Sequence, residues 1–159
     1  MKRLKIYLDT SVISHLDAPD VPEKEADTRR LWNDIKAGRY KAVLSNVVFD
    51  ELNRSGEPKR SFMLREIAEI DYGYVHLDAR GVEIASRFVD LGVLRQKSFD
   101  DCQHIAAAII GECEAIVSWN FKHIVNRKTM LGVKAVTALE GYDDLLIYSP
   151  TVLIGGEYE

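Results

Sequence analysis

The sequence predicts an α/β fold, a three-layer α/β/α sandwich with a central, mainly parallel sheet. Two observations support this prediction. Short apolar runs alternate along the chain with longer segments whose apolar residues recur at helical spacing, the pattern of parallel strands joined by helices. In addition, 47% of the 159 residues are hydrophobic, and no linker or internal repeat interrupts the pattern. We therefore expect a single domain over residues 1–159.

The expected strands are the short apolar runs. The first ends at Asp9, and helical spacing begins directly after it. The four expected strands are residues 4–8, 41–46, 72–78 and 115–120. The closing segments 133–142 and 145–154 give mixed signals, and the second of them is apolar enough to form a last strand or an interaction edge.

The expected helices have residues suited to helix ends. Pro22 suits the first turn of one helix and Gly38 its exit, and Gly92 closes a later one. The first helix starts near Thr10, and the others are expected over residues 22–37, 47–54, 58–70, 79–92 and 99–112. We expect residues 121–130 to be a short helix or irregular.

Composition narrows the class of protein. The net charge of −4 and the pI of about 5.6 argue against a general nucleic-acid binder. The charges are unevenly distributed, however. Residues 121–134 contain four basic side chains and no acid, and residues after Lys134 contain acids but no Lys or Arg. This basic strip is compatible with a polyanionic substrate.

Two further features bear on location. The two cysteines, Cys102 and Cys113, are too few for a disulfide framework or a zinc site, so we expect reduced core thiols. No window approaches the length of a membrane span, and the basic N-terminus lacks the long apolar stretch of a signal peptide. We therefore expect a cytoplasmic protein with no membrane partner.

Polar side chains stand where three of the expected strands end. The first strand runs into Asp9, the second runs into the helix that carries Glu51, and the fourth ends at Asn120. In open parallel sheets, ligands bind outside the carboxyl ends of the strands. If these strands are neighbours, the three side chains converge at one edge of the sheet.

Helical geometry separates neighbouring acids from one another. At 100° per residue, Glu51 falls on the arc of Val47 and Val48, whereas its neighbour Asp50 faces water. Asp101 similarly shares an apolar stripe that its neighbour Asp100 does not.

Three carboxylates, on Asp9, Glu51 and Asp101, are therefore expected to be at least partly buried. Buried ionised carboxylates are unfavourable by several kcal/mol each unless a cation neutralises them. Because the expected ligands are oxygen atoms without a His/Cys cluster, we expect Mg²⁺ or Mn²⁺ rather than zinc.

Each of these residues also has an ordinary structural interpretation. Asp9 could cap the helix that starts at Thr10. Asp101 could complete a capping box with Ser98. Glu51 could be a partly exposed helix residue, and Asn120 could serve a turn. Taken one at a time, the residues leave these alternatives open.

Four segments of the sequence resemble those of PIN-domain proteins, in the same order and at similar spacing. They are YLDTSVI, VVFDEL, DDCQHIAAA and IVSWNFKHI, and GYDDLLIYSP also resembles the chain end of one branch. The resemblance covers nearly the whole chain. It implies a parallel sheet flanked by helices and an acidic pocket that binds Mg²⁺ or Mn²⁺. Many PIN-domain proteins are ribonucleases, and many short ones are toxins of VapBC-type toxin–antitoxin pairs.

The resemblance also implies roles for individual residues. Asp9, Glu51 and Asp101 match the first three acids of the family, and Asn120 stands where many members have a fourth acid. We expect the three acids to hold the metal and Asn120 to assist. Thr10 and Ser118 are expected to support the site through their hydroxyl groups. We expect Lys122, Arg127 and Lys128 to contact the RNA backbone. The alternative interpretation of these three residues is a solvated basic face without a binding role.

His104 and His123 are interpreted as structural residues, and Trp32 and Trp119 as core or subunit contacts.

The leading hypothesis is a Mg²⁺- or Mn²⁺-dependent ribonuclease, the toxin of a toxin–antitoxin pair. The resemblance implies that it forms a homodimer and binds a small antitoxin protein. The alternative is a PIN-like RNA-binding or regulatory module without catalysis, which Asn120 motivates. A phosphatase of the haloacid-dehalogenase kind is disfavoured, because its chemistry needs a second aspartate where this chain has Ser11.

Overall fold

A five-stranded, entirely parallel sheet forms the centre of the computed structural model, which describes residues 2–155. The strands are β1 (Leu4–Leu8), β2 (Tyr40–Ser45), β3 (Tyr72–Val75), β4 (Ala115–Val117) and β5 (Leu146–Tyr148). Their order across the sheet is β3-β2-β1-β4-β5. The chain builds outward from β1 through β2 to β3 and then returns to place β4 on the other side of β1. Strands β1 and β4 therefore flank the point where the strand order reverses, which is the place where open sheets bind ligands.

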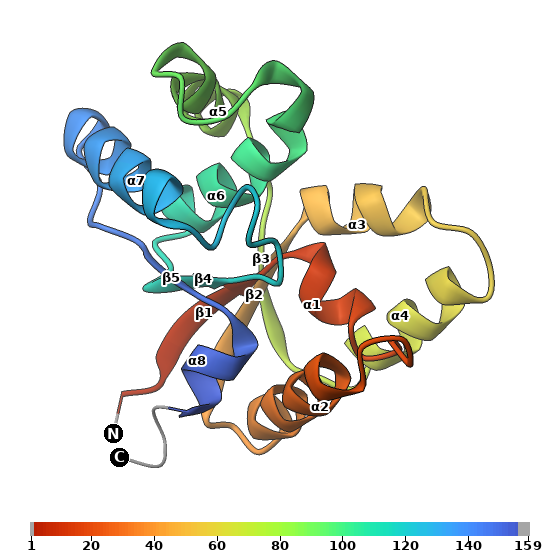
Figure 1. Ribbon diagram of the computed structural model, residues 1–159. Coiled ribbons are helices and arrows are strands. Elements are labelled where there is room, and N and C mark those ends of the chain that lie inside the picture. The colour runs from red at the N-terminus through yellow and green to blue at the C-terminus, as the bar shows by residue number, and fades with distance from the viewer. Residues whose placement is uncertain (1, 156–159) are drawn as a thin grey trace.

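Helices cover both faces of the sheet. They are α1 (Thr10–Ser14), α2 (Pro22–Lys36), α3 (Asn46–Asn53), α4 (Lys59–Ile67), α5 (Ala79–Asp90), α6 (Phe99–Ile110), α7 (Arg127–Glu140) and α8 (Pro150–Gly155), with a 3₁₀ turn at Gln96–Ser98. Helices α5, α6 and α7 gather on one side of the sheet, and α1, α2, α4 and α8 lie on the other (Figure 1). This arrangement confirms the predicted three-layer α/β/α sandwich.

The core lies between the sheet and these two helix layers. Ile6, Tyr7 and Leu8 of β1 are completely buried, as expected for the central strand of a parallel sheet. Trp32 of α2 is also completely buried, and Trp119 nearly so. Cys102 and Cys113 are free, buried cysteines, which confirms the expected core thiols.

Two expected strands are shorter than predicted. The third stops at Val75 rather than residue 78, because Asp78 caps α5 by accepting a hydrogen bond from the Gly81 amide. The fourth stops at Val117, although the backbone amide of Ser118 still donates to the carbonyl oxygen of Tyr148 at the end of β5 (3.0 Å). Among residues 2–155, no helix is long and apolar enough to cross a membrane.

The segments with mixed signals turn out to be regular. Asn126 caps α7, which runs unbroken to Glu140 and ends at Gly141, whose φ of +79° is readily available only to glycine. The segment from residue 145 onward splits into β5 and α8. Pro150 starts α8, because proline cannot donate to the sheet but suits the first turn of a helix.

Candidate functional site

Asp9 follows β1 and both caps a helix and lies within the candidate site. The residue as a whole is only 4% exposed. Its Oδ1 accepts hydrogen bonds from the Ser11 hydroxyl (2.6 Å) and the Val12 backbone amide (3.3 Å). Its other oxygen, Oδ2, accepts a hydrogen bond from the hydroxyl of Ser118, which directly follows β4. Asp9 therefore does cap α1, as the structural alternative predicted, and its side chain also contacts the residue that follows the neighbouring strand β4.

Glu51, on α3, contacts a buried histidine. Its Oε1 accepts a hydrogen bond from the Thr10 hydroxyl (3.1 Å) and lies against Nε2 of His104. The other ring nitrogen of His104, Nδ1, lies 2.7 Å from the hydroxyl of Tyr7, which in turn lies 2.7 Å from Oγ of Ser45. A continuous polar chain thus runs from β2 through β1 and α6 to Glu51.

Asp101, on α6, is held by the loop that follows β4. Asn120 Nδ2 donates to Asp101 Oδ1 (3.3 Å), and His123 Nδ1 lies 2.8 Å from Asp101 Oδ2. The side-chain Oδ1 of Asn120 accepts a hydrogen bond from the backbone amide of His123 (2.9 Å), and the backbone amide of Asn120 donates to Oγ of Ser118 (2.9 Å). Ser118 therefore connects Asp9 with the loop that holds Asp101. The capping-box alternative is absent, because Ser98 makes no side-chain cap hydrogen bond at the start of α6.

The electrostatics of the site centre on His104. Burial raises the pKa of Asp9 and also that of Asp101 above their ordinary values, and in both the charge of His104 opposes the shift. Burial is also the largest single influence on Glu51, but the hydrogen bond and charge of His104, the Thr10 hydroxyl and the charge of Arg54 together outweigh it, and the pKa of Glu51 is lowered. The pKa of His104 is raised, because Glu51 and the charges of Asp9 and Asp101 outweigh its own burial. The charge of one buried histidine thus interacts with the charges of three carboxylates, although His104 contacts only Glu51 directly.

The three acids fit a hard cation by their chemistry rather than by a ready-made cage. Among residues 2–155, no group of three or more His, Cys, Asp or Glu side chains is arranged to hold a metal ion. Their ligating atoms are nevertheless all oxygen, and burial disfavours the charges of Asp9 and Asp101. Mg²⁺ typically keeps several waters and binds only one or two carboxylates directly, so a closed cage of three acids is not required.

The basic residues expected to contact RNA lie in the loop that follows β4 and in the first turn of α7. Lys122, Arg127 and Lys128 are exposed. Lys122 and Lys128 line a cavity of about 720 Å³, whose lining does not include Arg127.

The sequence interpretation of His104 and His123 as structural residues does not predict which acids they contact. His104 contacts Glu51 on another helix, and His123 contacts Asp101. The spacing of His104, three residues after Asp101, places it near that acid on α6 but gives no signal for its contact with Glu51.

Comparison with known proteins identifies similar folds. No family model matches the sequence, and neither does any curated protein in the search. A chain of the VapBC2 structure from Rickettsia felis, solved bound to a DNA fragment from its promoter, matches with a TM-score of 0.55 and 13% identity. That match covers 92% of this chain and 98% of that one.

The second solved structure is VapC20 from Mycobacterium tuberculosis, described as a toxin that cleaves the sarcin–ricin loop. It matches with a TM-score of 0.54 and 20% identity, over 74% of this chain and 92% of that one. At these identities the likeness is one of fold. The chain shares its fold with these VapC-type structures, which confirms the PIN-like architecture that its sequence motifs predict.

Proposed function

We propose that this protein is a Mg²⁺- or Mn²⁺-dependent ribonuclease that hydrolyses RNA phosphodiester bonds and acts as the toxin of a toxin–antitoxin pair. One observation carries the proposal. Near the point where the strand order reverses, the charges of acids from the end of β1, from α3 and from α6 all act on one buried histidine, His104, which Glu51 contacts directly. The shared fold with an RNA-cleaving toxin, VapC20, supports the assignment of RNA as substrate.

The protein's own side chains would hold and orient the reacting groups. Asp9, Glu51 and Asp101 would bind the ion, directly or through water, and when bound the ion supplies an activated water and offsets charge on the phosphoryl oxygens. Ser118 fixes one oxygen of Asp9. Asn120 orients Asp101 through its amide nitrogen.

His104 and Thr10 orient the candidate ligand Glu51. Both contact Oε1, so Glu51 is held in one position between α1 and α6. The Tyr7 hydroxyl holds the other side of the His104 ring and thereby fixes its orientation. A carboxylate held in this way needs little rearrangement when an ion or a substrate arrives.

The proposed partners follow from the same function. We propose a homodimer, a small antitoxin protein as partner, and a cytoplasmic location. The similarity to a chain of the VapBC2 structure supports an antitoxin partner.

A second candidate function is an RNA-binding module without catalysis. It is favoured by Asn120, which contributes no charge, and by the hydrogen bonds that occupy both oxygens of Asp101.

A cleavage assay on a labelled RNA pool tests the proposal. The purified protein would be incubated with Mg²⁺, Mn²⁺ or EDTA beside the variants Asp9→Asn and Asp101→Asn. Asp100→Asn is the matched control, because Asp100 is an exposed neighbour that pairs with Arg54. We expect metal-dependent cleavage that only the Asp9 and Asp101 variants lose. RNA binding without cleavage in any metal would favour the second candidate function.

A further inference from the structure

A basic groove adjoins the candidate site. It has a volume of about 720 Å³ and lies between the segment 92–98, which leads into α6, and the segment 122–129, which leads into α7. One wall carries Arg95 and Lys97, and the other carries Lys122 and Lys128. No Asp or Glu is among the residues that line it. We call these four side chains the groove cations.

The groove cations are available to an outside anion. All four side chains are exposed, and within the described part of the chain none of them forms an ion pair. Basic residues on the neighbouring helices behave differently. Arg80 and Arg87 of α5 share Glu140 (each 2.9 Å) and also pair with Glu83 and Asp90, respectively, so acids already lie beside both charges.

The groove reaches the candidate site through His123. This side chain lines the groove, and its Nδ1 lies 2.8 Å from Oδ2 of Asp101. One residue of the groove lining is therefore in direct contact with one of the candidate acids.

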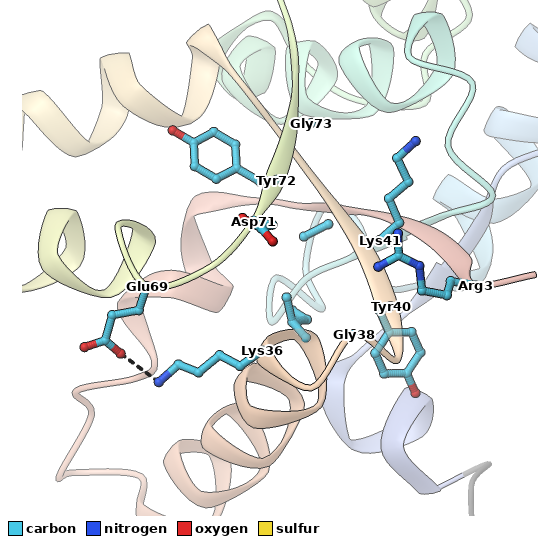
Figure 2. Close-up of a pocket in the computed structure, with 11 residues that line it drawn as sticks. Arg3, Lys36, Gly38, Tyr40, Lys41, Glu69, Asp71, Tyr72 and Gly73 are labelled. Carbon is cyan, nitrogen blue, oxygen red and sulfur yellow. Dashed lines mark hydrogen bonds and ion pairs between the residues drawn. The ribbon is translucent and has the colours of Figure 1, made fainter.

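A second cavity, by contrast, has a lining of mixed charge. It measures about 350 Å³, lies at the amino end of the sheet, and has both basic and acidic side chains in its lining. Figure 2 shows Lys36 of that cavity paired with Glu69, at 2.7 Å. Asp71 also lines it. That cavity offers a polyanion no uniformly positive path, whereas the groove does.

Resting on the proposed function, we infer that this groove binds the phosphodiester backbone of single-stranded RNA beside the bond to be cleaved. Arg95 and Lys97 contact phosphates from one wall, and Lys122 and Lys128 contact them from the other. A flexible single strand can follow cations on both walls, which is how sequence-tolerant single-strand grooves bind. Arg127 lies outside the groove and is not part of this path.

Fluorescence anisotropy with a labelled single-stranded oligoribonucleotide tests the inference. Titrations in EDTA, at several salt concentrations, separate binding from cleavage. The test variants are Arg95→Gln/Lys97→Gln and Lys122→Gln/Lys128→Gln. The matched control is Lys41→Gln/Lys134→Gln, which removes two exposed charges outside the groove. A duplex of the same sequence tests the preference for a single strand.

Each groove variant is expected to lower the slope of log affinity against log salt by about 1.4, since each lost phosphate contact contributes about 0.7. That change corresponds to roughly 25-fold weaker binding near 0.1 M salt, and the control should bind like the wild type. Unchanged affinity and slope in both groove variants would overturn the inference, as would absence of RNA binding by the wild type. Duplex binding as tight as single-strand binding would overturn the single-strand assignment.

The groove inference and the ribonuclease proposal can be refuted independently of each other. If the wild type binds RNA through the groove cations but cleaves none with Mg²⁺ or Mn²⁺, the groove stands and the ribonuclease proposal falls. If the wild type cleaves RNA and the groove variants bind it normally, the ribonuclease proposal stands and the groove falls.

Discussion

Replacing Asn120 by aspartate should destabilise the metal-free protein and strengthen its response to a divalent cation. Asn120 Nδ2 donates to Asp101 Oδ1 at 3.3 Å, so the new carboxylate oxygen would replace this donor with a like charge. Two unit charges at that distance repel by about 5 kcal/mol at an effective dielectric constant of about 20 and by about 1.3 kcal/mol in water. The Asp101 side chain is 21% exposed, so we expect a loss of about 2–3 kcal/mol near neutral pH.

The pH dependence of this loss has a definite sign. Burial already raises the pKa of Asp101, and a second carboxylate beside it raises that pKa further. The destabilisation is therefore present where both acids are ionised and disappears as the pH falls and one of them gains a proton.

Urea unfolding near pH 7.5, in EDTA and in about 100 Kd of Mg²⁺, measures both effects. The Kd meant is that of Asn120→Asp, and both proteins receive the same Mg²⁺ concentration. Mg²⁺ then adds about 2.7 kcal/mol to the variant, which recovers much of the loss, and adds less to the wild type, which binds the ion more weakly. Asn53→Asp is the control, because it adds the same charge at an exposed position of α3. Equal stability of Asn120→Asp and wild type in EDTA, or equal stabilisation of both by Mg²⁺, would refute the reasoning.

Three further variants have defined outcomes. Asp9→Asn should abolish cleavage yet keep or raise the melting temperature in EDTA. The reason is that burial raises the pKa of Asp9 and so disfavours its charged form. A clearly lower melting temperature would count against this. His104→Gln should flatten the pH profile of unfolding free energy. Because the pKa of His104 is raised in the folded protein, its protonation contributes stability that is fully present below the ordinary histidine pKa of 6.5 and is lost as the pH rises through the folded-state pKa. Parallel pH profiles for variant and wild type would contradict this role of His104. Phe88→Ala removes a fully buried ring from α5 and should lower the urea-unfolding free energy by about 3–5 kcal/mol, whereas a loss below about 1 kcal/mol would show that the site is not tightly packed.

The sequence predicted the placement of the acids because that placement depends on simple periodicities. Asp9 stands directly after a fully apolar run, so its position at the carboxyl end of a buried strand follows from the pattern alone. Asp101 shares a helical stripe with residues that the structure buries, such as Ile105. Glu51 is likewise half-buried rather than solvent-facing.

Other features depend on contacts between distant parts of the chain. Nothing local distinguishes a histidine that fills a core from one that contacts an acid on another element, and His123 meets Asp101 across 22 residues. Similarly, Arg127 and Lys128 lie 100° apart on α7, and only the packing of α7 beside the segment 92–98 decides that Lys128 lines the groove. Residues 133–142 include β-branched side chains, which lower helix propensity. Packing in the α5–α7 layer overrides this local preference, and the segment is helical to Glu140.

The central claim is that the acids around His104 bind a divalent cation, and calorimetric titration of Mn²⁺ into the metal-free protein tests it most directly. We expect saturable binding by the wild type and by Asp100→Asn, and its loss in both Asp9→Asn and Asp101→Asn. Absence of saturable binding by the wild type, or unchanged binding in the Asp9 and Asp101 variants, would contradict the account.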